Sequence, residues 1–185
     1  MASGAVVYVV GPSGAGKDSV LRGARDHLDQ RVRIAVRTIT RPPSESERNR
    51  EVSPETFAAE REAGRYALSW EANGHRYGIG TEIDDWLDRG AVVVVNGSRA
   101  HLPRAAERYG DRLHPLLITA EPEVLAARLA GRGRETAEER LARLQRSDAL
   151  GRPDHERLHV IDNSGALDDA VAACVDFLAA LGDDR

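Results

Sequence analysis

A seven-residue segment near the N-terminus constrains the fold of this chain more than any other feature. It fits the pattern G-x-x-x-x-G-K, and its residues are Gly11, Pro12, Ser13, Gly14, Ala15, Gly16 and Lys17. An apolar stretch over 5–10 precedes the segment, and an amphipathic stretch over 17–27 follows it. A strand, a glycine-rich loop and a helix in this order form a P-loop, whose backbone N–H groups surround phosphate oxygens. The sequence therefore predicts a P-loop α/β fold that binds ATP.

Lys17 stands out within this segment because it is the only lysine of the chain. All the other members of the 26 basic residues are arginine. The wide, planar guanidinium of arginine is a poor substitute for a compact ammonium group inside a tight phosphate loop. We therefore expect Lys17 to reach the outer phosphates of the nucleotide and to be catalytic.

The metal ligands are less clearly marked than the phosphate loop. A P-loop lysine is normally followed by a Ser or Thr that ligates Mg²⁺, whereas this chain continues with Asp18 and then Ser19. Either side chain could hold the metal, and Asp18 could also be a first-turn carboxylate that interacts with the helix dipole. The apolar stretch 91–95 ends in Asn96, where a Walker B strand would supply a carboxylate.

Apolar stretches alternate with helical stretches along the chain, which indicates a parallel sheet covered by helices. The expected strands are 5–10, 32–36, 91–95, 113–119 and 158–161, and the expected helices between and after them include 17–27, 81–89, 99–109, 122–130 and 166–181. We predict one domain over 1–185, with its core at 1–37, 81–130 and 147–185. The ligand should lie beyond the carboxyl ends of the strands.

Residues 38–80 are predicted to be an inserted, acceptor-binding helix and hairpin. Ser53-Pro54 is typical of a helix start, and Asn73-Gly74 between two alternating stretches is typical of a tight hairpin turn. The preceding segment 41–52 is polar and contains Pro42-Pro43, so we expect an exposed loop there.

A glycine- and arginine-rich segment over 131–146 is predicted to be a lid. Gly131 and Gly133 separate two helical stretches, and arginine there could neutralise charge that develops on the transferring phosphoryl group. Arg132 and Arg143 are the expected catalytic arginines, whereas Arg140 and Arg146 fit a solvated helix face.

Candidate acceptor contacts occur in two places. Arg41 directly follows a strand and two hydroxyl side chains, and it is the best candidate in the insertion, where Arg48 and Arg50 fit loop charges. Asn96, Ser98, Arg99 and His101 follow the central strand at its carboxyl end. His101 could equally be a helix-start residue.

The composition excludes several other classes of protein. A formal net charge of −4 lacks the basic field that nucleic-acid binders carry, so we expect no nucleic-acid partner. The longest apolar runs are strand-sized, which predicts no membrane span. The single cysteine, Cys174, cannot form a disulfide within the chain, and together with an N-terminus without a leader pattern this favours a cytoplasmic location. The oligomeric state is left open.

Several of these segments together resemble guanylate kinase over nearly the whole chain. They are the P-loop, the T-x-T-R pattern at 38–41, Tyr77-Gly78 and the Arg-Gly-Arg segment at 132–134. The closer resemblance is to the ribose 1,5-bisphosphate phosphokinase family of phosphonate metabolism, which makes 5-phosphoribosyl 1-diphosphate. It rests on Gly-Lys-Asp-Ser at 16–19 and on the longer stretches 68–74, 77–84, 95–103 and 132–135.

The resemblance implies Mg-ATP as the phosphoryl donor, a small phosphorylated sugar as the acceptor, and Tyr77 as a further acceptor contact. Guanylate kinases have a D-x-D pattern where this chain has Asn96-Gly97-Ser98, which weakens GMP as the acceptor. A phosphate monoester is already largely ionised at neutral pH, so no general base is required. The alternatives are a nucleoside monophosphate kinase, chiefly guanylate kinase, and an inactive guanylate-kinase-like interaction module.

Overall fold

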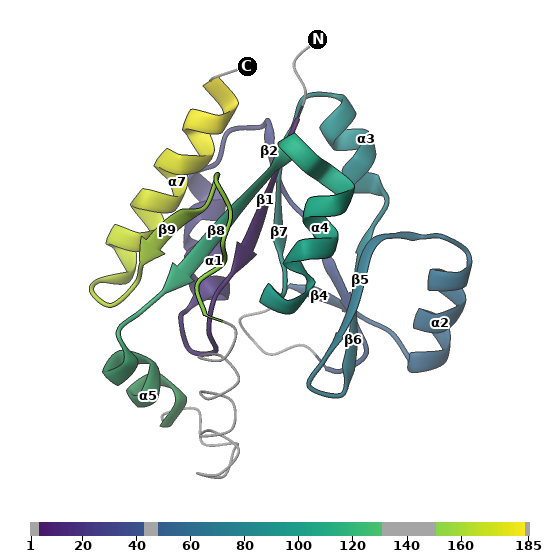
Figure 1. The fold of residues 1–185 in the computed structure, drawn as a ribbon, viewed down its shortest axis with the longest axis horizontal. Helices are drawn as coiled ribbons and strands as arrows, with labels where there is room; N and C mark the ends of the chain where they lie inside the picture. The colour runs from purple at the N-terminus through teal and green to yellow at the C-terminus, as the bar shows by residue number, and fades with distance from the viewer. Residues whose placement is uncertain (1–3, 43–47, 131–150, 184–185) are drawn as a thin grey trace.

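The strand β1, Ala5–Val10, lies at the centre of a five-stranded parallel sheet in this computed structural model, which describes residues 4–42, 48–130 and 151–183 (Figure 1). The strand order is β2 (Val32–Ile34), β7 (Val92–Asn96), β1, β8 (Leu113–Thr119) and β9 (His159–Asp162). Every pairing in this sheet is parallel. The carboxyl ends of β1, β7, β8 and β9 therefore lie at one edge, where a ligand is expected.

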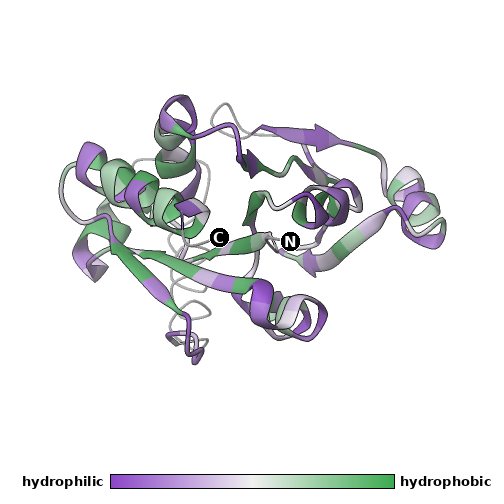
Figure 2. Cartoon of the chain, turned by 90° about the horizontal axis from the view of Figure 1, so that it is seen from above, coloured by the Kyte–Doolittle hydropathy of each residue, from purple (hydrophilic) through white to green (hydrophobic). Residues whose placement is uncertain are grey.

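Helices cover both faces of this sheet because successive side chains of each strand point to opposite sides. Val6, Tyr8 and Val10 pack into one core with α3 (Glu82–Asp88) and α4 (Leu102–Tyr109). The residues between them in β1 pack into a second core with α1 (Lys17–Ala24) and α7 (Leu167–Asp183). Figure 2 shows the same division, with hydrophobic strands inside and helices that are hydrophilic on their outer sides. Burial on both faces explains why β1 is apolar throughout.

A second, four-stranded sheet lies beside the first one (Figure 1). Its order is β4 (Asn49–Glu51), β3 (Arg37–Ile39), β6 (His75–Gly80) and β5 (Tyr66–Ala72). β5 and β6 form the hairpin predicted at Asn73-Gly74, where Asn73 has a φ of 51°. The helix α2, Pro54–Glu62, begins at Ser53, whose side chain accepts a hydrogen bond from the backbone N–H of Thr56.

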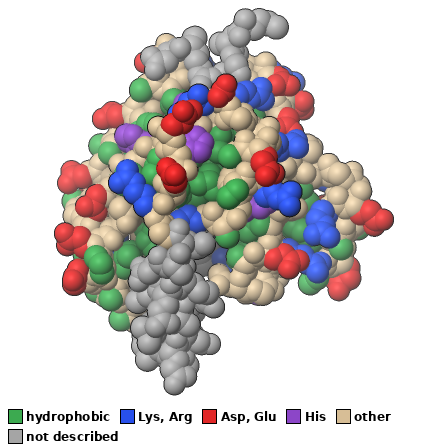
Figure 3. Space-filling model, in the orientation of Figure 1, with side chains coloured by type: hydrophobic (Ala, Val, Ile, Leu, Met, Phe, Trp, Pro, Cys, Tyr) green, Lys and Arg blue, Asp and Glu red, His purple; other side chains and the backbone are tan. Residues whose placement is uncertain are grey.

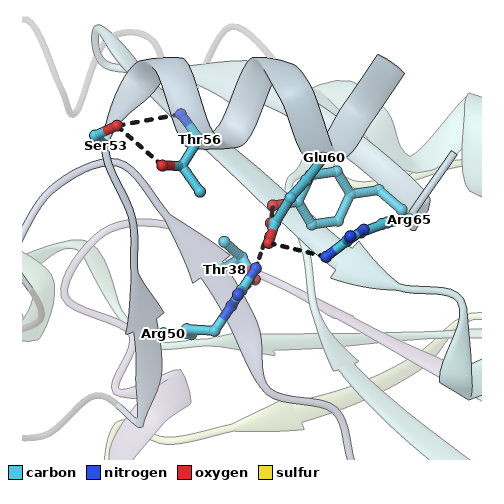
Figure 4. A network of polar contacts seen from close by, with 7 residues as sticks. Thr38, Arg50, Ser53, Thr56, Glu60 and Arg65 are labelled. Atoms are coloured by element: carbon cyan, nitrogen blue, oxygen red, sulfur yellow. Dashed lines mark hydrogen bonds and ion pairs between the residues drawn. The ribbon is translucent and has the colours of Figure 1, made fainter. Parts of the chain in front are cut away.

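A polar network ties α2 to the second sheet (Figure 4). The Arg50 guanidinium donates to Thr38 Oγ1 at 3.2 Å and also to the Glu60 carboxylate. The Tyr66 hydroxyl donates to the same carboxylate, and Arg65 lies 3.9 Å from its other oxygen. Hydrogen bonding by Arg50 and Tyr66 lowers the pKa of the Glu60 carboxyl group. Glu60 is thus a buried anion with its partners in place, which is the condition for burying a charge at low cost.

The sequence-based expectation for 41–52 was wrong over Asn49–Glu51. These residues form β4, which pairs in parallel with β3. The predicted strand 32–36 ends at Ile34, and the chain then enters the second sheet as β3. Strands of three residues with polar side chains have too little periodicity to be recognised, and here they are stabilised by neighbours that are distant in sequence.

The remaining expected elements agree with the structure wherever it describes them. They are the helical turns at Arg25–His27 and Arg99–His101 and the helix α5, Pro122–Ala130, whereas a further helical turn at Gly110–Arg112 was not predicted. Charged side chains of both signs are interspersed over the face seen in Figure 3. Within the described ranges, the helices are too short or too polar to cross a membrane.

Candidate active site

The loop between β1 and α1 has the backbone shape of a phosphate cradle. Gly14 and Gly16 adopt φ values of 87° and 84°, a conformation that L side chains rarely adopt. A Cβ atom on Gly16 would also lie 2.5 Å from Asn163 Nδ2, so a larger residue would not fit. Left-handed glycines of this kind are typical of the backbone nests in which N–H groups bind anions.

Lys17 points into this loop. Its ammonium group donates to the carbonyl oxygens of Gly11 and Pro12, at 2.9 and 3.2 Å. Both acceptors are neutral carbonyl oxygens of the loop. These two hydrogen bonds hold the ammonium group at the loop. A phosphate oxygen bound there would interact with the positive charge of Lys17 and with the backbone N–H groups.

Asp18 and Asn96 meet directly at the carboxyl end of β7. Asn96 Nδ2 donates to Asp18 Oδ1 at 2.7 Å, although the residues are 78 positions apart in the chain. Asn96 Oδ1 is buried and has no hydrogen-bond partner within the part of the chain that the structure describes. Ser19, the alternative metal ligand, is half-buried in the same helical turn. Asp18, one of the two predicted metal ligands, thus contacts Asn96, and Ser19 follows it in the helix.

The donor set at this point fits Mg²⁺ in a nucleotide complex. In the described ranges, no group of three or more His, Cys, Asp or Glu side chains is arranged to hold a metal ion by itself. Mg²⁺ usually binds proteins through one or two carboxylates and takes its other ligands from substrate phosphates and water. The Asp18 carboxylate at the start of α1, with Ser19 beside it, meets that requirement.

Tyr8 supports the loop that follows β7. Its hydroxyl oxygen accepts a hydrogen bond from the Ser98 backbone N–H at 3.1 Å and lies 3.4 Å from the Ser98 carbonyl oxygen. Burial raises the pKa of the Tyr8 phenol, which stays protonated and can both donate and accept. A Cβ on Gly97 would lie 2.1 Å from the Tyr8 ring, so glycine is required where the loop crosses the ring. The tyrosine was not a predicted site residue, because in the sequence it is one apolar position of a buried strand.

Asn163 contacts the P-loop directly, and Arg128 in turn contacts Asn163. Asn163 Nδ2 donates to the carbonyl oxygen of Ala15 at 2.8 Å, and Arg128 Nη2 donates to the Asn163 carbonyl oxygen at 2.8 Å. Arg128 Nη1 is buried without a hydrogen-bond partner among the described residues, and it lies 3.9 Å from the Cβ position of Gly16. Asn163 was missed by the sequence analysis, because nothing in its local pattern links β9 to a loop 148 residues away.

A stack of planar side chains connects the second sheet to the segment after β7. Arg37 lies over the Tyr77 ring at 5.3 Å, Tyr77 stacks on Trp70 at 5.6 Å, and Trp70 stacks on His101 at 5.5 Å. Burial, followed by the charge of Arg104, lowers the pKa of the His101 imidazole. His101 thus lies at the end of this stack, and its environment favours the neutral form of the imidazole.

Arg37 was also missed, and it joins the two sheets. Its Nε donates to Asn49 Oδ1 at 3.4 Å, and its Nη1 donates to the Asn96 carbonyl oxygen at 3.3 Å. Arg50, by contrast, lies on the α2 face of the second sheet with Glu60. The register explains the difference, because Arg50 pairs opposite Thr38, one position along from the Arg37–Asn49 pair.

The two other predicted acceptor-binding arginines, Arg41 and Arg99, contact different parts of the chain. Arg41 Nη1 donates to the Pro42 carbonyl oxygen at 2.9 Å, and Arg99 Nη1 donates to the Gly151 carbonyl oxygen at 2.7 Å. The two hydroxyl oxygens near Arg41 both accept hydrogen bonds within the second sheet, Thr38 Oγ1 from Arg50 at 3.2 Å and Thr40 Oγ1 from the Arg76 backbone N–H at 2.9 Å. Arg132 and Arg143, the predicted catalytic arginines, lie outside the described residues.

The sequence of this chain is similar to the sequences of known phosphokinases over nearly its whole length. The chain is 52% identical over 182 residues to ribose 1,5-bisphosphate phosphokinase PhnN of Burkholderia pseudomallei, covering 98% of each chain. It is 46% identical over 185 residues to the protein of the same name from Pseudomonas paraeruginosa, covering 99% of this chain and 98% of the relative. No family model matches the chain.

Solved structures with the same fold are more distant in sequence. Guanylate kinase from Anaplasma phagocytophilum superposes with a TM-score of 0.68 at 18% identity, covering 97% of this chain and 86% of the kinase. A gluconokinase from Sinorhizobium meliloti superposes with a TM-score of 0.54 at 17% identity, covering 98% and 95%. These similarities show the P-loop kinase fold.

Proposed function

The chain belongs to the ribose 1,5-bisphosphate phosphokinase family, and from this premise we propose that it transfers the terminal phosphoryl group of ATP to ribose 1,5-bisphosphate. The observation that carries the proposal is the lysine-bearing P-loop at the end of β1, beside the Asp18–Asn96 pair. A phosphate oxygen of the acceptor forms a bond to the γ-phosphorus, while the bond to the β–γ bridging oxygen breaks and ADP leaves with that electron pair. The product is 5-phosphoribosyl 1-diphosphate.

The nucleotide is held by the P-loop. Backbone N–H groups of the loop 11–17, in which Pro12 has none, bind phosphate oxygens, and the ammonium group of Lys17 neutralises charge on the outer phosphates. Asp18 is the metal ligand, with Ser19 as its nearest alternative. Mg²⁺ held there would supply positive charge that offsets the negative charge of the nucleotide phosphates.

The acceptor lies between the end of β7 and the second sheet. Arg41 binds its phosphate, and Tyr77, Ser98, Arg99 and His101 line the site. The acceptor oxygen is already largely ionised at neutral pH, since the second pKa of a phosphate monoester is about 6. The protein therefore needs no general base and contributes mainly positioning and charge neutralisation.

Two arginines complete the proposed machinery. Arg132 and Arg143 neutralise charge that develops on the phosphoryl group in the transition state. Their assignment rests on the glycine- and arginine-rich sequence around them and on its resemblance to the lid of the phosphokinases.

The product identifies the reaction. The purified enzyme is incubated with Mg-ATP and ribose 1,5-bisphosphate, and a phosphoribosyltransferase that consumes 5-phosphoribosyl 1-diphosphate is added with its base. We expect formation of the nucleotide in step with ADP release. Release of ADP without any substrate for the transferase would contradict the proposed reaction.

A further inference from the structure

We propose that Asn96 is a positioning residue, which orients the Asp18 carboxylate toward the divalent metal through the 2.7 Å hydrogen bond between them. This inference rests on the proposed function in one respect, the assignment of Asp18 as the metal ligand. It replaces the expectation from sequence that Asn96 contacts the acceptor.

The hydrogen bond joins two rigid parts of the fold. Asn96 is the last residue of β7 and pairs with Val9 of the central strand, and the Gly97 backbone N–H donates to the Val9 carbonyl oxygen at 2.9 Å. Arg37 Nη1 donates to the Asn96 carbonyl oxygen at 3.3 Å from the other sheet. Asp18 lies in the first turn of α1, directly after the P-loop. The backbones of both residues are therefore held in place, and the hydrogen bond sets the orientation of the Asp18 carboxylate relative to the end of β7.

Asn96 donates this hydrogen bond and Asp18 accepts it, so the Asp18 carboxylate can still ligate a metal ion. An ionised carboxylate only accepts hydrogen bonds and has about four lone-pair sites on two oxygens. The amide nitrogen occupies one site on Oδ1, and among the described residues no further hydrogen bond or ion pair occupies Oδ2 or the remaining site of Oδ1. A carboxylate with one oxygen fixed in this way loses less rotational freedom when it ligates a metal, which is how outer partners raise metal affinity.

Compared with the general P-loop arrangement, the carboxylate and the neutral polar group have exchanged places between the residue after the lysine and the residue at the end of the neighbouring strand. There, a hydroxyl follows the lysine and an Asp at the end of the Walker B strand completes the metal site. Here the carboxylate follows Lys17, and the neutral amide of Asn96 ends β7. The site keeps one negative charge and one neutral hydrogen-bonding group, and it avoids two carboxylates at hydrogen-bond distance, which would repel each other.

A second observation points in the same direction. Asn96 Oδ1 is buried and has no partner among the described residues, and a buried acceptor that is left unpaired is destabilising. An oxygen acceptor repels phosphate oxygens but accepts well from water bound to a metal ion. The orientation of the amide therefore favours the metal over the acceptor phosphate.

The test is a double-mutant cycle on metal affinity. Binding of Mn²⁺ to the enzyme–ADP complex is measured by electron paramagnetic resonance for wild type, Asp18→Ala, Asn96→Ala and the double variant. We expect Asn96→Ala to weaken Mn²⁺ binding by about 10-fold. In the Asp18→Ala background the Asn96 substitution should have no further effect, and the KM for the acceptor should stay near the wild-type value in the Asn96 variant.

Two controls keep the result specific. Asn49→Ala removes an asparagine whose side chain contacts Arg37 and not Asp18, and it should leave Mn²⁺ affinity unchanged. Asn96→Ser, which keeps a small hydrogen-bonding group, is measured if Asn96→Ala does not fold, and it should show the same dependence on Asp18.

Three results would overturn the inference. They are unchanged Mn²⁺ affinity in both Asn96 variants, a raised acceptor KM with normal Mn²⁺ affinity, and independent effects of the two substitutions. If Asp18→Ala itself leaves Mn²⁺ affinity intact, the metal assignment fails and the inference fails with it. Because the assay contains only ADP and Mn²⁺, a failure of the acceptor assignment is seen separately, as absent turnover of the bisphosphate.

Discussion

The substitution Gly97→Ala tests whether Tyr8 sets the position of the loop after β7. In the structure, the new Cβ would lie 2.1 Å from Tyr8 Cζ and 2.4 Å from Cε1, whereas ordinary contacts begin at 3.4 Å. Tyr8 is fully buried in the central strand, so its ring cannot move away. The loop itself must therefore shift by about 1 Å, taking Asn96 and Ser98 with it.

This shift should affect activity much more than stability. Overpacking of this kind costs about 1–3 kcal/mol, which corresponds to a Tm lower by about 2 to 12 °C for a chain of this size. A displacement of about 1 Å in a positioning element costs about 100-fold in rate. We therefore expect a folded enzyme whose kcat/KM, measured by coupled ADP release, is about 100-fold lower than that of wild type.

Gly165→Ala is the matched control. A Cβ at Gly165 would have no atom within 4 Å, so the same chemical change should leave both Tm and kcat/KM unchanged. Wild-type kcat/KM in a folded Gly97→Ala variant would refute the argument that the Tyr8 ring fixes this loop.

Three further substitutions test separate parts of the account. Lys17→Ala should lower kcat by about 100- to 1,000-fold in a folded protein, because its ammonium group donates to the loop carbonyl oxygens of Gly11 and Pro12, where the phosphates are expected. Near-normal ADP release would remove the lysine from the mechanism. Arg132→Ala and Arg143→Ala should each lower kcat by about 1,000-fold with smaller effects on KM, and a change confined to KM would make them ground-state binding residues. Glu60→Gln should lower stability by about 1 kcal/mol at pH 7, a modest value because its partner Arg50 is half exposed. Since the folded-state pKa of Glu60 is lowered, its contribution is present above the ordinary glutamate pKa of about 4.3 and is lost as the pH falls through the lower folded value. The Tm difference between the variant and wild type should therefore shrink below about pH 4, and a difference independent of pH would contradict the ion-pair argument.

Local signals were sufficient for much of the fold. The apolar run Ala5–Val10, the glycine loop and the amphipathic α1 follow each other directly, and Asn73-Gly74 specifies a two-residue turn by its own backbone preferences. Each of these elements was predicted correctly, and so were the parallel sheet and the family. Such features depend on hydrophobic periodicity and on turn-forming residues, and both can be read from residues that are adjacent in the sequence.

The rest depends on contacts between residues that are far apart in the chain. Tyr8 meets Ser98 across 90 positions, and Asn163 reaches the P-loop across 148 positions. The strands β3 and β4 are three residues long, and each is stabilised by pairing with the other rather than by an apolar pattern. The residues that surround a single polar side chain in the sequence do not indicate which distant residue it will contact. The roles of the predicted site residues, including Arg132 and Arg143, stay predictions.

The preference for the acceptor tests the central claim most directly. The loop after β7 offers Asn96 and Ser98, where guanylate kinases have the D-x-D acids that suit the N–H edge of guanine. Loss of hydrogen-bond partners for a polar substrate edge can cost about 10⁴-fold in discrimination. Steady-state kcat/KM is measured for ribose 1,5-bisphosphate and for GMP at saturating Mg-ATP. We predict a ratio of at least about 10⁴ in favour of the bisphosphate. Efficient conversion of GMP to GDP with no turnover of ribose 1,5-bisphosphate would contradict the account.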